Sequence, residues 1–220
     1  MRLFVVVKQP APGRVKTRLG KEIGPEAAAE LAQAFLDDTL RRLAPGRPTV
    51  VVHAPPELSP AFRARCRAQA PECTFVPQGP GDLGARLAAA LAGSGVRLAV
   101  GGDAPDLPLE RLERAAALLA AEADVVAVPA QDGGYSLLGL GPGVDAARLA
   151  GAIRWSSPHT WADTEAAFAG HTVVALEPWD DVDELEDLRA LCARLEPGVC
   201  AATEAWARAN GYLDTHEGQC

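Results

Sequence analysis

The sequence predicts an α/β protein, a three-layer α/β/α sandwich built on a mixed, mostly parallel sheet. Short runs of β-branched residues alternate with longer segments rich in Ala, Leu, Arg and Glu, which is typical of βα units around a parallel sheet. Two of these runs are separated only by Ala130 to Gly134, too short a stretch for a crossover of about a dozen residues. We therefore expect one antiparallel hairpin in an otherwise parallel sheet.

The expected strands are short β-branched or aliphatic runs bounded by Gly, Pro or polar residues. They cover Leu3–Val7, Thr49–His53, Thr74–Val76, Leu98–Val100, Asp124–Pro129, Tyr135–Leu140 and Thr172–Leu176. Ligands of such sheets lie outside the carboxyl ends of the strands. The loops after Val7, Val76, Val100 and Pro129 are therefore expected to line the functional site.

Helices are expected between the strands, where apolar residues recur at helical spacing. Pro45-Gly46 ends the first helix and Asn210-Gly211 ends the last. Ser59-Pro60 and Ser157-Pro158 each indicate an N-cap followed by a first-turn proline, whose missing N–H needs no partner there. The predicted helices cover Glu26–Leu43, Ala61–Gln69, Leu83–Leu91, Leu109–Ala121, Thr160–Ala169, Leu185–Leu195 and Ala202–Ala209.

Length and composition limit the classes to which the chain can belong. With 220 residues and 48% hydrophobic content, residues 1–220 are expected to form a single domain with a substantial core. A net charge of −8 and only 5% aromatic residues argue against a nucleic-acid partner. Neither an apolar run of about 20 residues nor a signal peptide is evident, so we expect a cytoplasmic protein without a membrane partner. A homodimer and a monomer both stay open.

The cysteines form neither a disulfide framework nor a zinc site by their spacing, because no C-x-x-C pair occurs. We expect them to be mostly reduced and structural. They are Cys66, Cys73, Cys192, Cys200 and Cys220.

A cluster of positive charge follows the first predicted strand, although the chain is acidic overall. Pro10 and Pro12 stiffen this loop, and Gly13 lets its backbone approach a ligand closely. The loop lacks the G-x-x-x-x-G-K-[ST] spacing of a P-loop. Lys and Arg donate charge-assisted hydrogen bonds to phosphate oxygens, so a phosphate chain is the expected ligand, and a solvated basic loop is the alternative. The cations are Lys8, Arg14, Lys16 and Arg18.

A carboxylate follows the fourth predicted strand. Gly101 and Gly102 permit close approach of the backbone, and Asp103 is placed to hold Mg²⁺ (or Mn²⁺) on a nucleotide. One such carboxylate suffices for this prediction, because Mg²⁺ usually takes one or two carboxylates plus substrate phosphates. In the alternative, Asp103 and Asp106 only organise the turn into the next helix.

The loop after the third predicted strand offers further contacts to a nucleotide. Free N–H groups and the helix dipole at Gly81, Asp82 and Leu83 can meet a base edge or a phosphate. Arg86 lies one turn into the same helix. Asp82 as a simple N-cap is the alternative.

The turn of the predicted hairpin faces the part of the sheet edge where an acceptor would lie. Asp-Gly is also the preferred tight hairpin turn, so a purely structural role stays open. The stretch from Arg154 to Ser157 either extends the acceptor pocket or supplies a core Trp beside a capping Ser. The predicted acceptor-binding residues are Asp132, Gly133, Gly134, Tyr135, Trp155 and Ser156.

An acidic cluster spans Asp180 to Asp187 at an expected helix start. Acids there are stabilised by the helix dipole, typically by about 0.3 to 1 kcal/mol each. The cluster exceeds what capping requires, so Asp181 or Asp183 is predicted to supply a second metal contact, with the dipole as the rival explanation.

Taken together, these motifs run in a recognisable order from Leu3 to about Leu188. They are K-x-P-x-P-G-x-V-K-T-R-L, G-D-L-G-x-R-L, G-G-D-x-P-x-L, D-G-G-Y-x-L-x-G-L, W-S and D-V-D-x-x-x-D-L. The order resembles the nucleotide-diphospho-sugar transferase superfamily with the GT-A fold, specifically the small glycosyltransferase-like family similar to phospholactate guanylyltransferase. The resemblance implies a nucleotide held by the first loop, a metal on Asp103, and an acceptor near Asp132 to Tyr135.

The leading functional prediction is transfer of a nucleoside monophosphate from a nucleoside triphosphate to a small phosphate or hydroxyl acceptor, with release of pyrophosphate. A glycosyltransferase with a nucleotide-sugar donor and Asp132 as base is one alternative, because the first loop is Pro-rich where nucleotidyltransferases are usually glycine-rich. A non-catalytic nucleotide-binding module is another. The predicted catalytic residues are Lys16, Arg18, Asp103 and Asp132, and the predicted nucleotide-binding residues are Lys8, Pro10, Gly13, Lys16, Arg18, Gly81, Asp82, Leu83, Arg86, Gly102 and Asp103.

Overall fold

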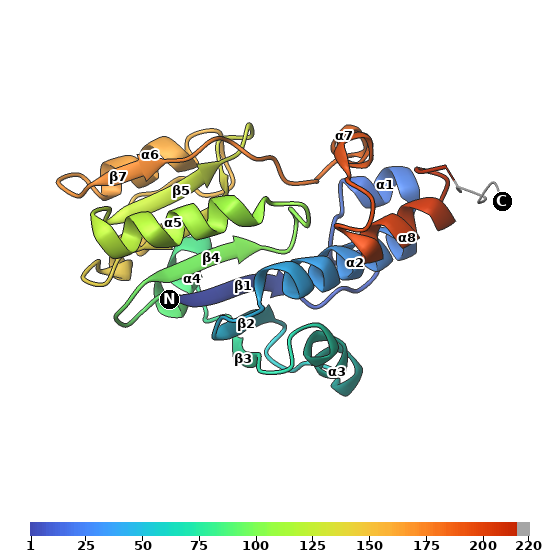
Figure 1. The fold of residues 1–220 in the computed structure, drawn as a ribbon, viewed down its shortest axis with the longest axis horizontal. Coiled ribbons are helices and arrows are strands. Elements are labelled where there is room, and N and C mark those ends of the chain that lie inside the picture. The colour runs from blue at the N-terminus through green and yellow to red at the C-terminus, as the bar shows by residue number, and fades with distance from the viewer. Residues whose placement is uncertain (215–220) are drawn as a thin grey trace.

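Seven strands form one sheet in the computed structural model, which describes residues 1–214 (Figure 1). Their order across the sheet is β3-β2-β1-β4-β6-β5-β7. The strands are β1 (Arg2–Lys8), β2 (Thr49–Ala54), β3 (Thr74–Pro77), β4 (Arg97–Gly101), β5 (Val125–Pro129), β6 (Tyr135–Leu140) and β7 (Val173–Ala175). Each lies within two residues of its predicted bounds.

Strand β6 is antiparallel to both of its neighbours, β4 and β5, while the other paired strands are parallel. The predicted hairpin is confirmed: β5 and β6 pair across the short loop 130–134, with an irregularity in register at Val128 and Pro129. The mixed, mostly parallel sheet of the predicted fold class is thereby confirmed.

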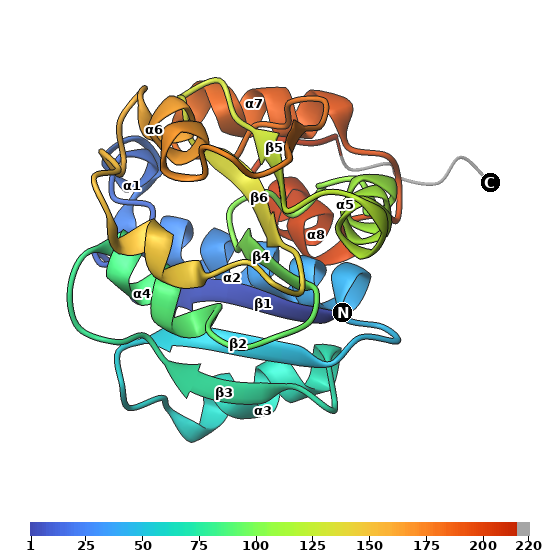
Figure 2. The ribbon, with the colours of Figure 1, turned by 90° about the vertical axis from the view of Figure 1, so that its left-hand side faces the viewer.

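Helices cover both faces of the sheet, as Figure 2 shows. One face packs against α2 (Pro25–Leu43), α3 (Pro60–Gln69) and α5 (Leu109–Ala121). The other packs against α4 (Leu83–Ala90), the 3₁₀ helix η1 (Ala146–Ala150) and the end of α6 (Thr160–Ala167). A third apolar cluster joins α2 to α1 (Leu19–Ile23), α7 (Leu185–Arg194) and α8 (Ala201–Ala209) at one end of the molecule.

Strand β1 shows why the sheet takes helices on both sides. Leu3 and Val5 lie in the core beneath α2, whereas Phe4 lies in the core beneath α4. Successive side chains of a strand point to opposite faces, so a central strand that is buried on both faces is apolar throughout. This arrangement leaves the carboxyl ends of the strands and their loops for polar chemistry.

The N-cap predicted at Ser59 and the N-cap considered for Asp82 are both present, whereas the N-cap and first-turn proline predicted at Ser157-Pro158 are not, although α6 starts at Thr160 as predicted. Ser59 Oγ accepts a hydrogen bond from the Phe62 amide, and Asp82 Oδ1 accepts one from the Ala85 amide, at 3.1 and 2.9 Å. Ser157-Pro158 does not begin α6, which starts at Thr160. Ser157 Oγ instead donates to the Arg154 carbonyl (2.6 Å), so the dipeptide closes a turn before the helix.

The described cysteines are free and buried: Cys66, Cys73, Cys192 and Cys200. Burial raises the pKa of the Cys66 and Cys200 thiols to about 12, which keeps them protonated and unreactive near neutral pH. Cys220 lies outside the described residues. None of the helices within residues 1–214 combines the length and the apolar character that a bilayer crossing requires.

Candidate active site

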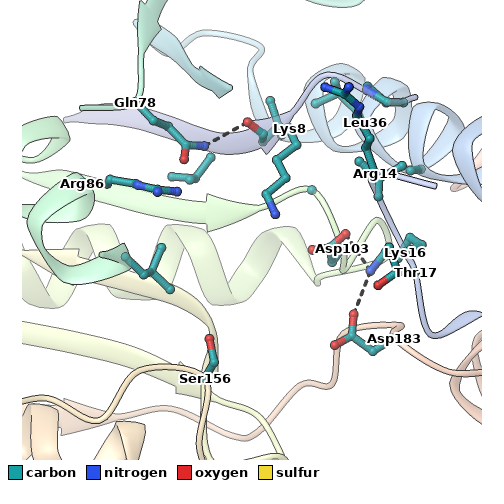
Figure 3. Close-up of a pocket in the computed structure, with 17 residues that line it drawn as sticks. Lys8, Arg14, Lys16, Thr17, Leu36, Gln78, Arg86, Asp103, Ser156 and Asp183 are labelled. Carbon is teal, nitrogen blue, oxygen red and sulfur yellow. Dashed lines mark hydrogen bonds and ion pairs between the residues drawn. The ribbon is translucent and has the colours of Figure 1, made fainter. Parts of the chain in front are cut away.

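A cavity of about 490 Å³ opens at the carboxyl ends of the central strands (Figure 3). Basic residues from the first loop line it on one side, and the ends of β3 and β4 contribute to the rest. The predicted convergence of the loops after β1, β3 and β4 is therefore present in the structure. The polar residues that line this cavity, which we call the basic cavity, are Lys8, Arg14, Lys16, Thr17, Gln78, Arg86, Asp103, Ser156 and Asp183.

The first loop is tied to the strands beside it. The Gln9 amide donates to the Ala54 carbonyl (2.6 Å), and Gln9 Oε1 accepts from the Ser59 amide (2.9 Å). Gln78 Nε2 donates to the Val7 and Val52 carbonyls at 3.0 and 3.3 Å. Gln78 was missed at the level of sequence, although its position just after the third strand was a usable signal. Lys8, Arg14 and Lys16 line the cavity beside it.

Lys16 is the most constrained of these cations. Its Nζ lies 2.7 Å from Asp103 Oδ1 and 3.2 Å from Asp183 Oδ1, and it also donates to the Val182 carbonyl. Only 3% of the side chain is exposed. Burial disfavours the charged ammonium, but Asp103 and Asp183 more than offset this effect, and the pKa of Lys16 is raised. Lys16 therefore stays positively charged between two carboxylates.

A second cavity of about 490 Å³ lies beyond Asp103, on the side of the hairpin. We call it the acidic cavity, because four carboxylates line it: Asp103, Asp132, Asp181 and Asp183. Arg18 also lines it and lies 3.7 Å from both Asp183 and Glu184. Two cavities of opposite charge thus meet at Asp103 and Asp183, which line both.

Asp181 is buried beside the other carboxylates of the acidic cavity. Burial, followed by the charge of Asp183, raises the pKa of its carboxyl to about 6. Asp132 and Asp103 act in the same direction, and Lys16 offsets them only in part. Further positive charge in this cavity would be stabilising.

Oxygen donors of this kind suit Mg²⁺, which also keeps waters and takes substrate phosphates as ligands. Within residues 1–214, no three His, Cys, Asp or Glu side chains are grouped closely enough to enclose a metal on their own. The residues present would fit an ion on Asp103 and Asp181 only if waters or phosphate oxygens completed its coordination. Asp183 lies beside them, paired with Lys16 and Arg18.

A third, smaller cavity of about 240 Å³ lies beneath the start of α4 and joins the other two at Leu83 and Asp103. Its walls are mainly apolar, with Tyr135 and Trp155 at the border to the acidic cavity. The two rings meet edge to face at 6.2 Å between centroids. Trp155 thus combines the two roles that the sequence left open, as a packed aromatic and as a wall of the site.

The hairpin turn also combines a structural and a site role. Asp132 Oδ1 accepts a hydrogen bond from the Gly134 amide (2.8 Å), which closes the turn as the preferred Asp-Gly geometry predicts. Asp132, Gly134 and Tyr135 line the acidic cavity as well. Gly133 does not line it, but it permits the turn through a φ of +87°.

The loop before α4 carries G-x-G-x-x-G spacing at Gly79, Gly81 and Gly84, a spacing that also occurs in dinucleotide-binding folds. The topology excludes that fold here, because β3 is an edge strand and not the central first strand of a βαβ unit. Gly84 is needed for packing, since a Cβ would lie 2.3 Å from Trp155 Nε1. Gly81 instead accepts the Arg86 Nε–H through its carbonyl (2.9 Å).

The acidic segment after β7 divides its residues among several tasks. Glu184 and Asp187 form a capping box at α7, as the dipole explanation requires. Asp180 accepts from the Gln131 amide (2.8 Å) and so ties the segment to the hairpin loop. Of the residues from Asp180 to Asp187, only Asp181 and Asp183 line the cavities. These are the two residues that the sequence predicted as metal contacts.

Trp179 anchors this segment, in an arrangement that the sequence did not reveal. The guanidinium groups of Arg111 and Arg194 lie over its ring, 4.6 and 5.2 Å from the centroid. Its Nε1 donates to Asp106 (3.2 Å), which also pairs with Arg194 Nε (2.6 Å). Asp106 therefore holds the acidic segment and does not line the three cavities described above.

The structure brings together most of the predicted site residues. Four of them lie outside the cavities: Gly13, which adopts a φ of +70° in the loop, the exposed Gly81 and Asp82, and Gly133 in the hairpin turn. Those that line at least one cavity are Lys8, Pro10, Lys16, Arg18, Leu83, Arg86, Gly102, Asp103, Asp132, Gly134, Tyr135, Trp155, Ser156, Asp181 and Asp183.

Residues 38–157 match a family described as "Uncharacterized protein conserved in bacteria (DUF2064)". The chain belongs to this family. No curated protein sequence matches the chain. The matched residues include α4, the loop after β4 and the hairpin, which carry Arg86, Asp103 and Asp132. The first loop and the acidic segment lie outside them.

Solved structures share the fold over nearly the whole chain. A candidate nucleotide-diphospho-sugar transferase from Desulfovibrio desulfuricans G20 is 28% identical with a TM-score of 0.78, over 96% of this chain and 99% of that one. A nucleotidyl transferase from Methanothermobacter is 16% identical (TM-score 0.56; 94% and 99% covered). A cytidylyltransferase from Leptospira borgpetersenii is 12% identical (TM-score 0.55; 100% and 98% covered). The resemblance to the GT-A superfamily is confirmed.

Proposed function

We propose that this DUF2064 protein is a metal-dependent nucleotidyltransferase, which moves a nucleoside monophosphate from a nucleoside triphosphate to a small phosphate or hydroxyl acceptor. The observation that carries the proposal is the meeting of a basic and an acidic cavity at Asp103. Cationic side chains bind phosphates, so the basic cavity suits the nucleoside triphosphate. Carboxylates bind Mg²⁺, so the acidic cavity suits a metal ion and the acceptor molecule beside it.

The basic cavity suits the triphosphate. Lys8 and Arg14 extend from the first loop and Arg86 faces them from α4, so a phosphate chain between them would meet donors from both sides (Figure 3). In the transfer, an acceptor oxygen forms a bond to the α-phosphorus while the bond to the departing pyrophosphate breaks. Such a step depends mainly on positioning and on neutralising charge, which these side chains supply.

The acidic cavity suits the acceptor and the ion. Asp103 and Asp181 would hold Mg²⁺, which when bound would act as a Lewis acid on the phosphate that is attacked. Arg18 lies at this cavity with two-thirds of its side chain exposed, so it is free to turn towards the departing phosphates. Asp132, Gly134 and Tyr135 would contact the acceptor.

Glycosyl transfer from a nucleotide-sugar is the second candidate function. Two observations favour it: the 28% identical structure is a candidate nucleotide-diphospho-sugar transferase, and the cavity of about 240 Å³ beside Asp103 offers room for a sugar ring. Asp132 would then act as a base towards the acceptor hydroxyl. A nucleotide-binding module without catalysis would bind the same donors without turning them over.

A ligand screen followed by identification of the product tests these proposals. Thermal unfolding is measured with nucleoside triphosphates and nucleotide-sugars, each with and without Mg²⁺, because a ligand at 100 times its Kd stabilises by about 2.7 kcal/mol. Phosphorus NMR of the best donor with candidate acceptors then distinguishes pyrophosphate from nucleoside diphosphate. Pyrophosphate supports the first function and nucleoside diphosphate the second. Failure of every nucleotide to shift the unfolding temperature would overturn both.

A further inference from the structure

Lys16 cannot keep all its contacts within the protein and also donate a hydrogen bond to a phosphate. A lysine ammonium has three N–H donors, and in the structure its acceptors are Asp103, Asp183 and the Val182 carbonyl. Its side chain is almost fully buried. An ammonium held in this way has no donor left for a phosphate, although it lines the basic cavity where phosphates are expected.

Lys16 also contacts carboxylate oxygens that a metal ion would need as ligands. Its nitrogen lies between Asp103 and Asp183, within hydrogen-bond distance of both (Figure 3). A divalent ion on Asp103 would lie within a few ångströms of this ammonium, and like charges so close repel strongly in a partly buried site. A metal ion on Asp103 would therefore disfavour the Lys16–Asp103 ion pair, and the ion pair would disfavour the metal.

The backbone of Lys16 has an unfavourable conformation, which its side-chain contacts help to maintain. Its φ is +45°, in the left-handed region that non-glycine residues rarely adopt. Within residues 1–214, Ser156 is the other non-glycine residue with a positive φ, and it also lines the basic cavity. Conformations of this kind persist where surrounding contacts impose them, and they cluster at sites that rearrange.

We infer that Lys16 and a divalent ion compete for the Asp103 carboxylate, so that the metal binds tightly only when donor phosphates draw the ammonium away from it. This inference rests on the proposed function, because it takes the metal and the phosphates from it. Phosphates in the basic cavity offer Lys16 another anionic partner, and its departure frees the oxygens for the ion. Nucleotide and metal then raise each other's affinity by the same factor.

Binding of Mn²⁺ alone to two lysine variants tests the competition. Lys16→Met removes the competing charge, and we expect it to bind Mn²⁺ at least about tenfold more tightly than the wild type, since a nearby like charge is lost. Lys8→Met is the matched control: it removes one positive charge from the same cavity, but Lys8 makes no ion pair with a carboxylate in the described part of the chain. We expect its Mn²⁺ affinity to stay within about twofold of the wild type. Equal effects of the two substitutions would overturn the inference.

A labelling experiment on the wild type keeps the inference testable if Lys16→Met does not fold. The chain contains only three lysines, Lys8, Lys16 and Lys21, so an amine-reactive reagent with mass spectrometry reads each separately. Lys8 and Lys21 are exposed and should react quickly, while Lys16 should be protected. Saturating Mg²⁺ without nucleotide should increase Lys16 labelling severalfold and leave Lys21 unchanged. Bound Mg²⁺ with Lys16 still protected would show shared occupancy and overturn the competition.

These outcomes are separate from the test of the proposed function, because no nucleotide is present. If neither the wild type nor Lys16→Met binds Mn²⁺, the competition is overturned, whereas the nucleotide screen still decides whether the basic cavity takes a donor.

Discussion

The Val182 amide donates a hydrogen bond to the carbonyl of Asp103 at 3.0 Å. This bond joins the acidic segment after β7 to the loop after β4, although the two residues lie far apart in the chain. Asp181 and Asp183 lie on either side of Val182 in the chain, so this bond holds both of them next to Asp103. The carboxylates of the acidic cavity are thus fixed by backbone contact as well as by Lys16.

Asp103→Asn should reduce the turnover of the proposed reaction by about 10²- to 10³-fold, the usual cost of losing one group that stabilises developing charge. The amide keeps the shape and one oxygen of the carboxylate, but buried Lys16 loses the charge nearest to it, so the unfolding temperature should also fall and the kinetics are measured well below it. Steady-state kinetics with the donor found in the screen measures the loss. Glu186→Gln is the control, because Glu186 belongs to the same acidic stretch but is 80% exposed on α7. Equal activity of the two variants would contradict a role for Asp103.

Asp106→Asn should lower the free energy of unfolding by about 1 to 3 kcal/mol, since it weakens buried hydrogen bonds to a charged partner. Asp106 is 8% exposed and bonds to both Arg194 and Trp179. Urea unfolding measures the change. The control is Arg114→Met, which breaks the exposed Arg114–Glu177 pair and should cost less than about 1 kcal/mol. Similar losses in both variants would show that the Asp106 contacts add nothing beyond a surface ion pair.

The sequence contained enough information for the main elements and for the edge of the sheet that carries the site. The hairpin followed from the length of loop 130–134, because five residues cannot form a crossover. Helix α1 and η1 were missed, and each has five residues. Elements of that length do not show a helical period, so no sequence pattern could reveal them.

The partners of the site residues were beyond sequence reasoning. Lys16 and Asp183 are 167 residues apart, and only the folded sheet brings them together. Their charges were visible in the sequence, but either could equally have faced a ligand. The same holds for Trp179, whose two arginine neighbours come from α5 and α7. Local patterns report periodicity and capping, whereas these contacts depend on the topology.

Asp181 should make the stability of the metal-free protein fall as the pH rises from about 4 to about 6. Burial and then the charge of Asp183 raise its pKa from 3.8 to about 6 in the folded state. The native protein therefore binds this proton more tightly than the unfolded chain does, and that stabilisation is lost once the pH passes the folded pKa. Asp181→Asn removes the effect and should be more stable than the wild type at pH 7 by an amount of order 1 kcal/mol.

Urea unfolding at a series of pH values in the presence of a chelator measures this difference. The gap between the variant and the wild type should be small at pH 4 and widest above pH 6. Parallel profiles across this interval would mean that folding does not raise the pKa of Asp181.

Gly133→Ala should destabilise the hairpin turn by about 1 to 3 kcal/mol or more, because a left-handed backbone and a clash act together. Gly133 has a φ of +87°, and a Cβ there would lie 2.4 Å from the Cα and carbonyl oxygen of Pro158. Those atoms belong to backbone and cannot move aside as a flexible side chain could. The Gly133 carbonyl also accepts a hydrogen bond from the Trp161 amide (2.8 Å), so the strain reaches the start of α6.

Gly143→Ala is the matched control for this substitution, since no atom lies within 4 Å of its added Cβ. Urea midpoints of the two variants give the comparison, and Gly143→Ala should stay close to the wild type. The acceptor should also bind more weakly to Gly133→Ala, because Gly134 and Tyr135 on the same turn line the acidic cavity. Equal midpoints for the two variants would show that the turn relaxes without cost, and would remove the reason for a glycine at this position.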